Sequence, residues 1–246
     1  MSYVGNPINV IKKLYSQKSW DEIIFFCKKM LEEDPKDMVA LQNMATALLN
    51  TGQYDEALEC CENVLQMNRL DEYALKNKIF ALERLGRYDD VIKASETLLE
   101  KDKYSTWALD SKALALNEKG NHKEALRCYD MSIQIDGNNT TALMNKAITL
   151  SFLEKFSDAI DFFDRAQRSD ESLKDAAAAK SEAYKRIGKE DEAFLAAQGM
   201  LVSEIEQYVI EAREKKMRIF DLYCLKEYEQ LEAKERTHNK KQKSKS

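Results

Sequence analysis

Few residues of this chain are of the types that perform chemistry, and they are not grouped in the sequence. Two histidines occur, His122 and His238, and the second lies in a lysine-rich tail. A zinc site or a Ser–His or Cys–His nucleophile needs a histidine with partners close by in the fold. The sequence contains no phosphate loop, dinucleotide fingerprint, nucleophile elbow or zinc-protease motif. We therefore expect no enzyme, no catalytic residue, no metal site and no cofactor. His122 stands at the start of a predicted helix, and we interpret it as structural.

The cysteines indicate a reducing environment. They are odd in number and form no C-x-x-C pair: Cys27, Cys60, Cys61, Cys128 and Cys224. The first ten residues lack the basic and apolar segments of a secretory signal. No run of ~18 apolar residues is present to span a bilayer. We expect a soluble, cytoplasmic protein whose thiols are reduced and packed as small apolar side chains.

The composition favours an elongated helical protein. Charged residues make up 33% of the 246 residues and apolar residues 44%, whereas an average domain has ~25% charged residues. Seven glycines and two prolines are too few for a turn-rich β-sandwich or barrel. A net charge of −5 favours neither nucleic acid nor an anionic membrane as partner.

A period of 34 residues organises the chain. Gly52, Gly86, Gly120 and Gly188 are separated by this period or twice this period. Six consecutive segments result, and they start at residues 4, 38, 72, 106, 140 and 174. Their eleventh positions are Leu14, Leu48, Leu82, Leu116, Leu150 and Tyr184, and alanine fills most of the third and twentieth positions. Such a regular period is typical of repeat architectures.

Each segment has the pattern of two amphipathic helices joined by a turn at the glycine column. The first helix of four segments is preceded by a residue that is favoured at helix N-caps, namely Asp37, Asp71, Ser105 or Asn139. The second helix has an acidic residue in its first turn in every segment, which favours the positive end of the helix dipole. The pattern therefore predicts repeated helix pairs.

These columns resemble the tetratricopeptide repeat (TPR) family over Val4 to about Leu201. The clearest stretches surround Gly52 and Gly120, whereas the first and fifth segments have Lys18 and Glu154 in the glycine column. The resemblance implies an all-α fold, a right-handed α-solenoid of six 34-residue helix–turn–helix repeats, whose first helices line a concave groove. Each repeat buries its apolar face against its neighbours.

The resemblance also implies which positions face the groove. The sixth positions form a mostly amide column: Asn9, Asn43, Asn77, Ser111 and Asn145. Related TPR proteins use asparagines at this position to bind a peptide main chain, and an amide has both a donor and an acceptor for this purpose. Other predicted groove residues are Tyr73, Lys76, Phe80, Trp107, Leu114, Met144 and Ile148. The alternatives are that the amides make only local hydrogen bonds and that the apolar residues pack between successive first helices.

Lysines recur at the seventh position, as Lys78, Lys112, Lys146 and Lys180. We expect their ammonium groups at the edge of the groove, either as a solvated row of charges or as a site for acidic peptides. The carboxylate clamp with which some TPR proteins bind chaperone tails is absent, because Lys76 is followed by Phe80, Ser111, Thr141 and Asn145 at the clamp positions.

The region after the repeats divides into two predicted parts. Residues 202–233 contain neither Gly nor Pro and carry a helical apolar stripe, with Ser203 and Glu206 as a candidate capping box. We interpret this region as an amphipathic capping helix, or alternatively as a self-association or docking helix that uses Ile219, Phe220, Tyr223 and Leu231. From Glu232 onward six Lys or Arg residues face two acids, and residues 234–246 are predicted to be a basic disordered tail.

The sequence thus predicts a non-catalytic protein–protein interaction adaptor that binds another protein or a peptide segment in the concave groove. The alternative is a self-associating scaffold or assembly factor that acts through residues 201–233.

Overall fold

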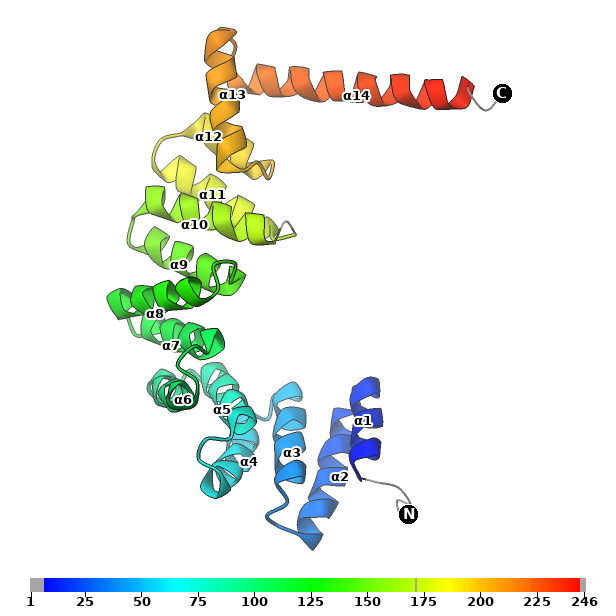
Figure 1. Ribbon diagram of the computed structural model, residues 1–246, viewed down its shortest axis with the longest axis vertical. Helices are drawn as coiled ribbons and strands as arrows, with labels where there is room; N and C mark the ends of the chain where they lie inside the picture. The colour runs from blue at the N-terminus through cyan, green and yellow to red at the C-terminus, as the bar shows by residue number, and fades with distance from the viewer. Residues whose placement is uncertain (1–6, 171, 244–246) are drawn as a thin grey trace. The chain divides into compact units, whose positions relative to one another are not determined.

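The computed structural model describes residues 7–170 and 172–243, and these residues form helices and short turns without any strand (Figure 1). The predicted all-α fold is confirmed. The chain divides into two compact units, an N-terminal unit, Met1–Gly137, and a C-terminal unit, Asn138–Ser246. In the part of the chain that is described, none of the helices combines the length and the apolar character needed to cross a bilayer.

The described part of the N-terminal unit consists of alternating first and second helices. The first helices are α1 (Pro7–Gln17), α3 (Met38–Asn50), α5 (Glu72–Arg84) and α7 (Thr106–Glu118). The second helices are α2 (Trp20–Glu33), α4 (Tyr54–Met67), α6 (Tyr88–Lys101) and α8 (His122–Ile135). Each helix packs against the next along the chain, and α3 also packs against α5. The predicted period is visible directly, since α2, α4, α6 and α8 begin at residues 20, 54, 88 and 122.

The C-terminal unit continues the same period and then departs from it. Its first helices are α9 (Thr140–Phe152) and α11 (Lys174–Arg186), and its second helices are α10 (Phe156–Ser169) and α12 (Glu190–Ala197). The last of these has only eight residues, whereas α10 has fourteen. Gly199 follows it with a φ of +84°, a left-handed conformation that ends a helix. Two further helices follow, α13 (Val202–Glu214) and α14 (Ile219–Lys243).

The predicted helix caps are present. Oδ1 of Asp71 accepts a hydrogen bond from the Ala74 N–H at 2.9 Å, and Asp37, Ser105 and Asn139 cap α3, α7 and α9 in the same way. Each cap satisfies a backbone donor that the first turn of a helix leaves without a partner. The first helices of successive repeats therefore begin at fixed points.

The turn between the two helices of a repeat is left-handed whether or not it contains glycine. Gly52, Gly86, Gly120 and Gly188 have φ values between +68° and +79°. Lys18 and Glu154, which replace glycine in this column, adopt the same conformation, with φ values of +53° and +59°. A side chain in this region costs energy, so packing of the flanking helices must hold these two turns.

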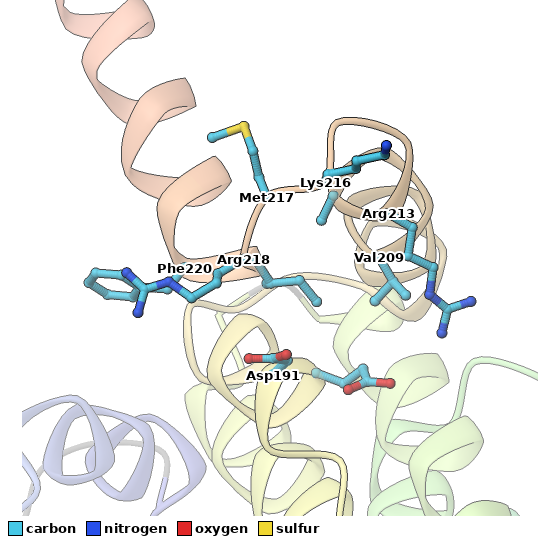
Figure 2. Close-up of a pocket in the computed structure, with 10 residues that line it drawn as sticks. Asp191, Val209, Arg213, Lys216, Met217, Arg218 and Phe220 are labelled. Atoms are coloured by element: carbon cyan, nitrogen blue, oxygen red, sulfur yellow. The ribbon is translucent and has the colours of Figure 1, made fainter.

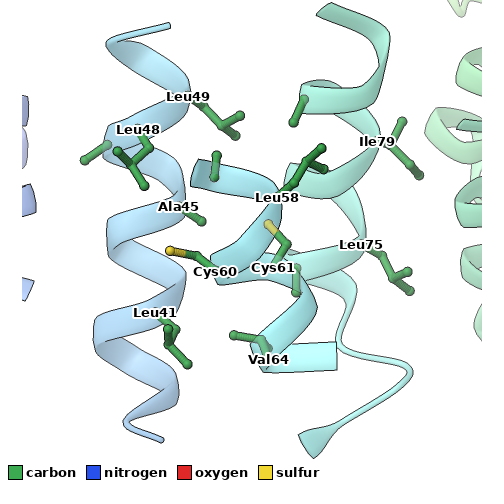
Figure 3. Packing of buried hydrophobic residues seen from close by; sticks show 14 of the residues in the cluster. Leu41, Ala45, Leu48, Leu49, Leu58, Cys60, Cys61, Val64, Leu75 and Ile79 are labelled. Carbon is green, nitrogen blue, oxygen red and sulfur yellow. The ribbon is translucent and has the colours of Figure 1, made fainter. Parts of the chain in front are cut away.

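The core consists of the predicted columns. Leu48 and Leu82 are fully buried, and all described members of the third, eleventh and twentieth columns are buried. Figure 3 shows Cys60 of α4 pointing toward α3, and leucines of α3, α4 and α5 belong to one cluster of buried residues. Burial raises the pKa of the Cys61 thiol to about 12, which makes the reactive thiolate scarce. Four cysteines are buried as predicted, but the prediction is wrong for Cys224, which is exposed on α14.

The region after the repeats contains two helices where one capping helix was predicted. The chain turns between α13 and α14, and Lys216 has a φ of +50° there. The start of α13 also differs from the predicted capping box. The helix begins at Val202, and the carboxylate that accepts the Leu201 N–H, at 2.7 Å, belongs to Glu204.

Ile205, Ala212, Ile219 and Leu222 bury against apolar residues of α11 and α12. The backbone of residues 234–243 is helical, as the end of α14, whereas a disordered tail was predicted from residue 234. Residues 244–246 lie outside the described part.

Candidate protein-binding face

The predicted groove residues of the N-terminal unit lie on its first helices. Asn43 is on α3, Tyr73, Lys76, Asn77 and Phe80 are on α5, and Trp107, Ser111 and Leu114 are on α7. Alanines in the third column, Ala40, Ala74 and Ala108, are buried, and such small residues allow neighbouring helices to approach closely. The helices thus present their polar and aromatic side chains as adjacent rows.

A cluster of hydrogen bonds joins α3 to α5. The hydroxyl groups of Thr46 and Tyr73 lie 2.7 Å apart, and Nδ2 of Asn77 donates to Oγ1 of Thr46 at 3.0 Å. Tyr15 of α1 adjoins this cluster, and burial, together with the nearby Tyr73, raises its pKa to about 12. These side chains are held by one another, so their positions are defined before any partner binds.

The amide column is therefore not uniform. Nδ2 of Asn43 donates to the Val39 carbonyl of its own helix at 2.7 Å, and that of Asn77 is used by Thr46. Ser111 is buried, and Asn9 is exposed on α1. The local hydrogen bond considered as an alternative is therefore present at Asn43, whereas the bond of Asn77 reaches the neighbouring helix α3. In both residues the amide N–H, and not the side-chain oxygen, makes the bond.

Three aromatic side chains remain exposed on α5 and α7, and we call them the aromatic face: Tyr73, Phe80 and Trp107. Their exposed fractions are 45%, 37% and 37%. Each has a polar or cationic neighbour in contact. Tyr73 bonds to Thr46, the guanidinium of Arg84 lies 5.2 Å from the ring centre of Phe80, and Nζ of Lys76 lies 5.9 Å from that of Trp107. Cations over rings favour one ring orientation.

Lys76 and Val39 complete this surface. The ammonium of Lys76 forms an ion pair with Glu72 at 2.8 Å while it lies over Trp107. Val39, at the same repeat position as Tyr73 and Trp107, is 41% exposed. The sequence interpretation missed Val39, although reading the second column of the repeats together would have found it. Leu114 is half-buried between helices and contributes less exposed area.

The remaining predicted residues belong to the C-terminal unit. Met144 and Asn145 are half-buried on α9, and Ile148 on the same helix is 48% exposed. They form a separate set from the aromatic face.

The lysines at the seventh position do not line a groove edge in the manner predicted. Lys78 pairs with Glu62 at 3.0 Å and Lys112 pairs with Glu96 at 2.7 Å, in each case on the second helix of the preceding repeat. Lys180 follows the same spacing, and its ammonium pairs with Asp164 at 2.8 Å. These lysines connect successive repeats, because an acidic residue of the preceding second helix lies within ion-pair distance of each ammonium group.

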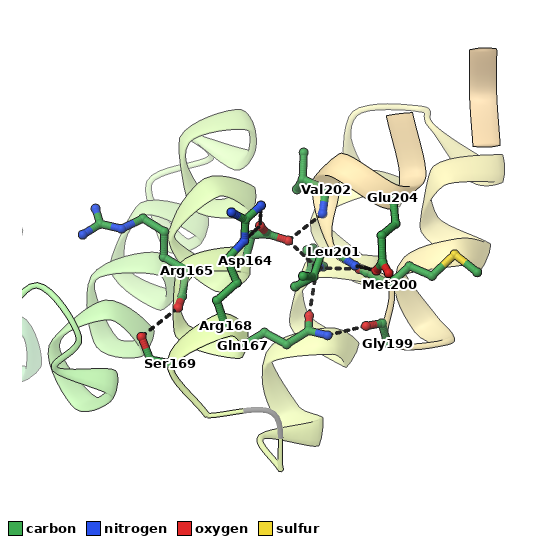
Figure 4. Close-up of polar contacts among 11 residues, drawn as sticks. Asp164, Arg165, Gln167, Arg168, Ser169, Gly199, Met200, Leu201, Val202 and Glu204 are labelled. Atoms are coloured by element: carbon green, nitrogen blue, oxygen red, sulfur yellow. Dashed lines mark hydrogen bonds and ion pairs between the residues drawn. The ribbon is translucent and has the colours of Figure 1, made fainter. Parts of the chain in front are cut away.

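Lys180 departs most clearly from the predicted position at the groove edge, because its side chain is fully buried. Its ammonium also donates to Oε1 of Gln167 at 2.8 Å and to the Met200 carbonyl at 2.7 Å. Figure 4 shows the surrounding network, in which Oδ1 of Asp164 accepts the Val202 N–H at 2.6 Å. Desolvation lowers the pKa of Lys180, and Asp164 opposes this effect. The network fixes the start of α13.

An open cleft of about 530 Å³ lies where α12, α13 and α14 meet (Figure 2). Asp191 and Glu192 supply its acids, and Arg213, Lys216 and Arg218 supply its bases, so its charges largely offset one another.

Among residues 7–170 and 172–243, no group of three His, Cys, Asp or Glu side chains is placed to hold a metal ion. Nδ1 of His122 lies 2.6 Å from Oδ1 of Asn117 across the turn between α7 and α8.

Comparison with known proteins agrees with this arrangement. Residues 14–79, which extend from α1 into α5, match a family model described as tetratricopeptide repeat. This stretch of the chain is therefore similar to tetratricopeptide repeats. None of the curated proteins matches the chain.

Several solved TPR structures share the fold. PilW, a widely conserved type IV pilus biogenesis factor, is 18% identical, with a TM-score of 0.69 over 77% of this chain and 88% of its own. A TPR protein from Parabacteroides merdae is 16% identical, with a TM-score of 0.67 over 77% and 75%. YrrB, described as a TPR protein with an unusual peptide-binding site, is 17% identical, with a TM-score of 0.55 over 69% and 88%. These TPR structures show the fold alone, since their identities are low.

Proposed function

We propose that this protein is a non-catalytic adaptor and that the aromatic face of its N-terminal unit binds a segment of another protein. The observation that carries the proposal is the exposure of Tyr73, Phe80 and Trp107 on the first helices α5 and α7. Exposed apolar patches mark interaction sites, and Trp and Tyr are enriched among the residues that dominate binding energy. Their fixed neighbours reduce the entropy lost on binding.

The polar groups beside the aromatic face suit the main chain of a bound segment. No hydrogen bond from another described residue reaches the side-chain oxygens of Asn43 and Asn77, each of which uses an amide N–H as a donor. These oxygens are therefore available to accept backbone N–H groups, which every peptide has. In this proposal the aromatic rings select apolar anchors, and the amide oxygens hold the backbone regardless of its sequence.

Other observations support the same proposal. YrrB, which shares the fold, is described as having a peptide-binding site. The ion pairs of Lys78 and Lys112 use those ammonium groups within the repeats, which argues against selection of acidic peptides by this row. The five cysteines are free thiols, four of them buried, so we place the protein in a reducing compartment such as the cytoplasm.

The test uses peptides selected by display against the full chain, with affinities measured by calorimetry. Phe80→Ala and Trp107→Ala should each weaken binding about tenfold or more, the effect expected for a residue at the centre of an interface. Tyr104→Ala is the matched control, because Tyr104 is a 75% exposed aromatic residue between α6 and α7, outside this face. Selected peptides that bind all three variants as tightly as the unchanged chain would refute the proposed site.

A further inference from the structure

The last helix, α14, is attached to the C-terminal unit through its first two turns. Phe194 of α12 makes edge-on ring contacts with Phe220 and Tyr223, at 5.4 and 5.3 Å between ring centres. Lys226 forms an ion pair with Glu211 of α13. Figure 1 shows the rest of α14 extending away from α13. A helix of 25 residues is about 37 Å long, so most of its length lies beyond these contacts.

The opposite face of α14 is apolar and exposed. Leu225, Tyr228 and Leu231 are 39%, 61% and 58% exposed, and Cys224 is exposed beside them. Their spacing places them on one side of a helix, about half a turn around the axis from the residues that pack on α12 and α13. A helical stretch without tertiary packing is only marginally stable in water, so this face needs a partner.

The charges along α14 separate into two halves. From Ile219 to Glu232 the sequence has four acids, Asp221, Glu227, Glu229 and Glu232, against one base, Lys226, which gives a net charge of −3. From residue 233 to 243 it has five Lys or Arg residues against one acid, which gives +4. The helix thus carries opposite charges at its two ends, and the exposed apolar side chains lie in the acidic half.

We propose that α14 pairs antiparallel with α14 of a second copy of this chain. Antiparallel pairing sets the acidic half of each helix beside the basic half of the other, whereas parallel pairing would place like charges together. The aliphatic stems of lysine and arginine can cover apolar surface while their charged ends reach nearby acids. The basic half of one copy therefore covers Tyr228 and Leu231 of the other. The pairing does not involve the aromatic face and is independent of the proposed adaptor function.

Sedimentation velocity of the full chain at several concentrations tests the pairing. The unchanged chain should show a reversible monomer–dimer equilibrium that shifts toward monomer as salt is added. The double variant Glu227→Lys/Glu229→Lys should raise the dimer dissociation constant about tenfold or more. Its matched control is Glu32→Lys/Glu59→Lys, which changes the net charge equally at exposed positions on α2 and α4 and should dimerise normally. A chain that stays monomeric throughout, or equal effects of the two double variants, would overturn the proposal.

The exposed Cys224 tests the orientation. If the helices cross near residue 232, the two Cys224 side chains lie roughly 25 Å apart along the axis, and mild oxidation gives no cross-linked dimer. In a parallel pair they would lie side by side, within reach of a disulfide. Efficient Cys224–Cys224 cross-linking of the dimer would therefore overturn the antiparallel assignment. Circular dichroism of each variant confirms that it is folded.

Discussion

The repeated ion pair between a first helix and the preceding second helix gives a prediction in which the main difference between positions is burial. Lys78, Lys112 and Lys180 occupy the same repeat position and pair with an acid sixteen residues earlier. The side chains of Lys78 and Lys112 are 24% and 23% exposed, and their partners are about half exposed, whereas Lys180 and its partner are 0% and 6% exposed. Replacement of each lysine by methionine keeps the apolar stem and removes the charge.

The expected costs differ strongly along this series. Exposed ion pairs contribute about 0.2–1 kcal/mol, so Lys78→Met and Lys112→Met should each lower the free energy of unfolding by less than about 1 kcal/mol. Loss of one partner of a buried pair costs about 3–5 kcal/mol, because the other charge remains buried without a compensating charge. Arg168 and the Val202 N–H still contact Asp164, which places Lys180→Met near the lower end of that range.

Urea unfolding followed by circular dichroism measures the cost, and hydrogen exchange locates it. In Lys180→Met the amides of α11 and α13 should exchange faster, because the Met200 carbonyl and Asp164 lose the ammonium that joins them. Amides of α3 to α6 should keep their protection, since repeats are coupled mainly to their neighbours. If Lys180→Met costs no more than Lys112→Met, burial does not control the strength of this pair and the reasoning fails.

Four further predictions follow from individual positions. Leu82→Ala, in the fully buried eleventh column, should cost about 2–5 kcal/mol, and an unchanged urea midpoint would contradict the stacking register. Glu154→Gly should stabilise the chain by about 1 kcal/mol and Gly120→Ala should destabilise it by a similar amount, because both residues have positive φ; shifts of the same sign would count against this. With Ellman's reagent only Cys224 should react quickly in the native chain. Burial raises the pKa of Glu83 above 4.5, so its ionisation opposes folding at neutral pH. Glu83→Gln should therefore gain stability at pH 7, and a gain that persists below its ordinary pKa would refute this cause.

The sequence predicts the fold well because the relevant interactions are local and repeated. Asp71 caps α5 by accepting a hydrogen bond from a residue three positions later. The regular recurrence of leucine in the column of Leu48 and Leu82 predicts that these side chains are buried. Lys18 and Glu154 were placed in the glycine column by the period, but only the structure shows that their turns are left-handed.

The parts that were not predicted depend on distant or individual contacts. Burial of Lys180 requires the short α12 and the return of the chain at Met200, neither of which the period describes. The turn at Lys216 contains no glycine or proline to mark it. Whether Asn43 bonds to its own helix or remains available depends on its rotamer, which spacing alone does not determine.

The central claim is that the aromatic face of α5 and α7 binds a protein segment, and Trp107 reports on this directly. The chain has only two tryptophans, so a Trp20→Phe background leaves Trp107, 37% exposed, as the sole indole signal. Titration with a display-selected peptide should shift its emission to shorter wavelength and reduce quenching by acrylamide, with a midpoint equal to the calorimetric dissociation constant. Tight binding that leaves both the emission and the quenching of Trp107 unchanged would contradict the claim.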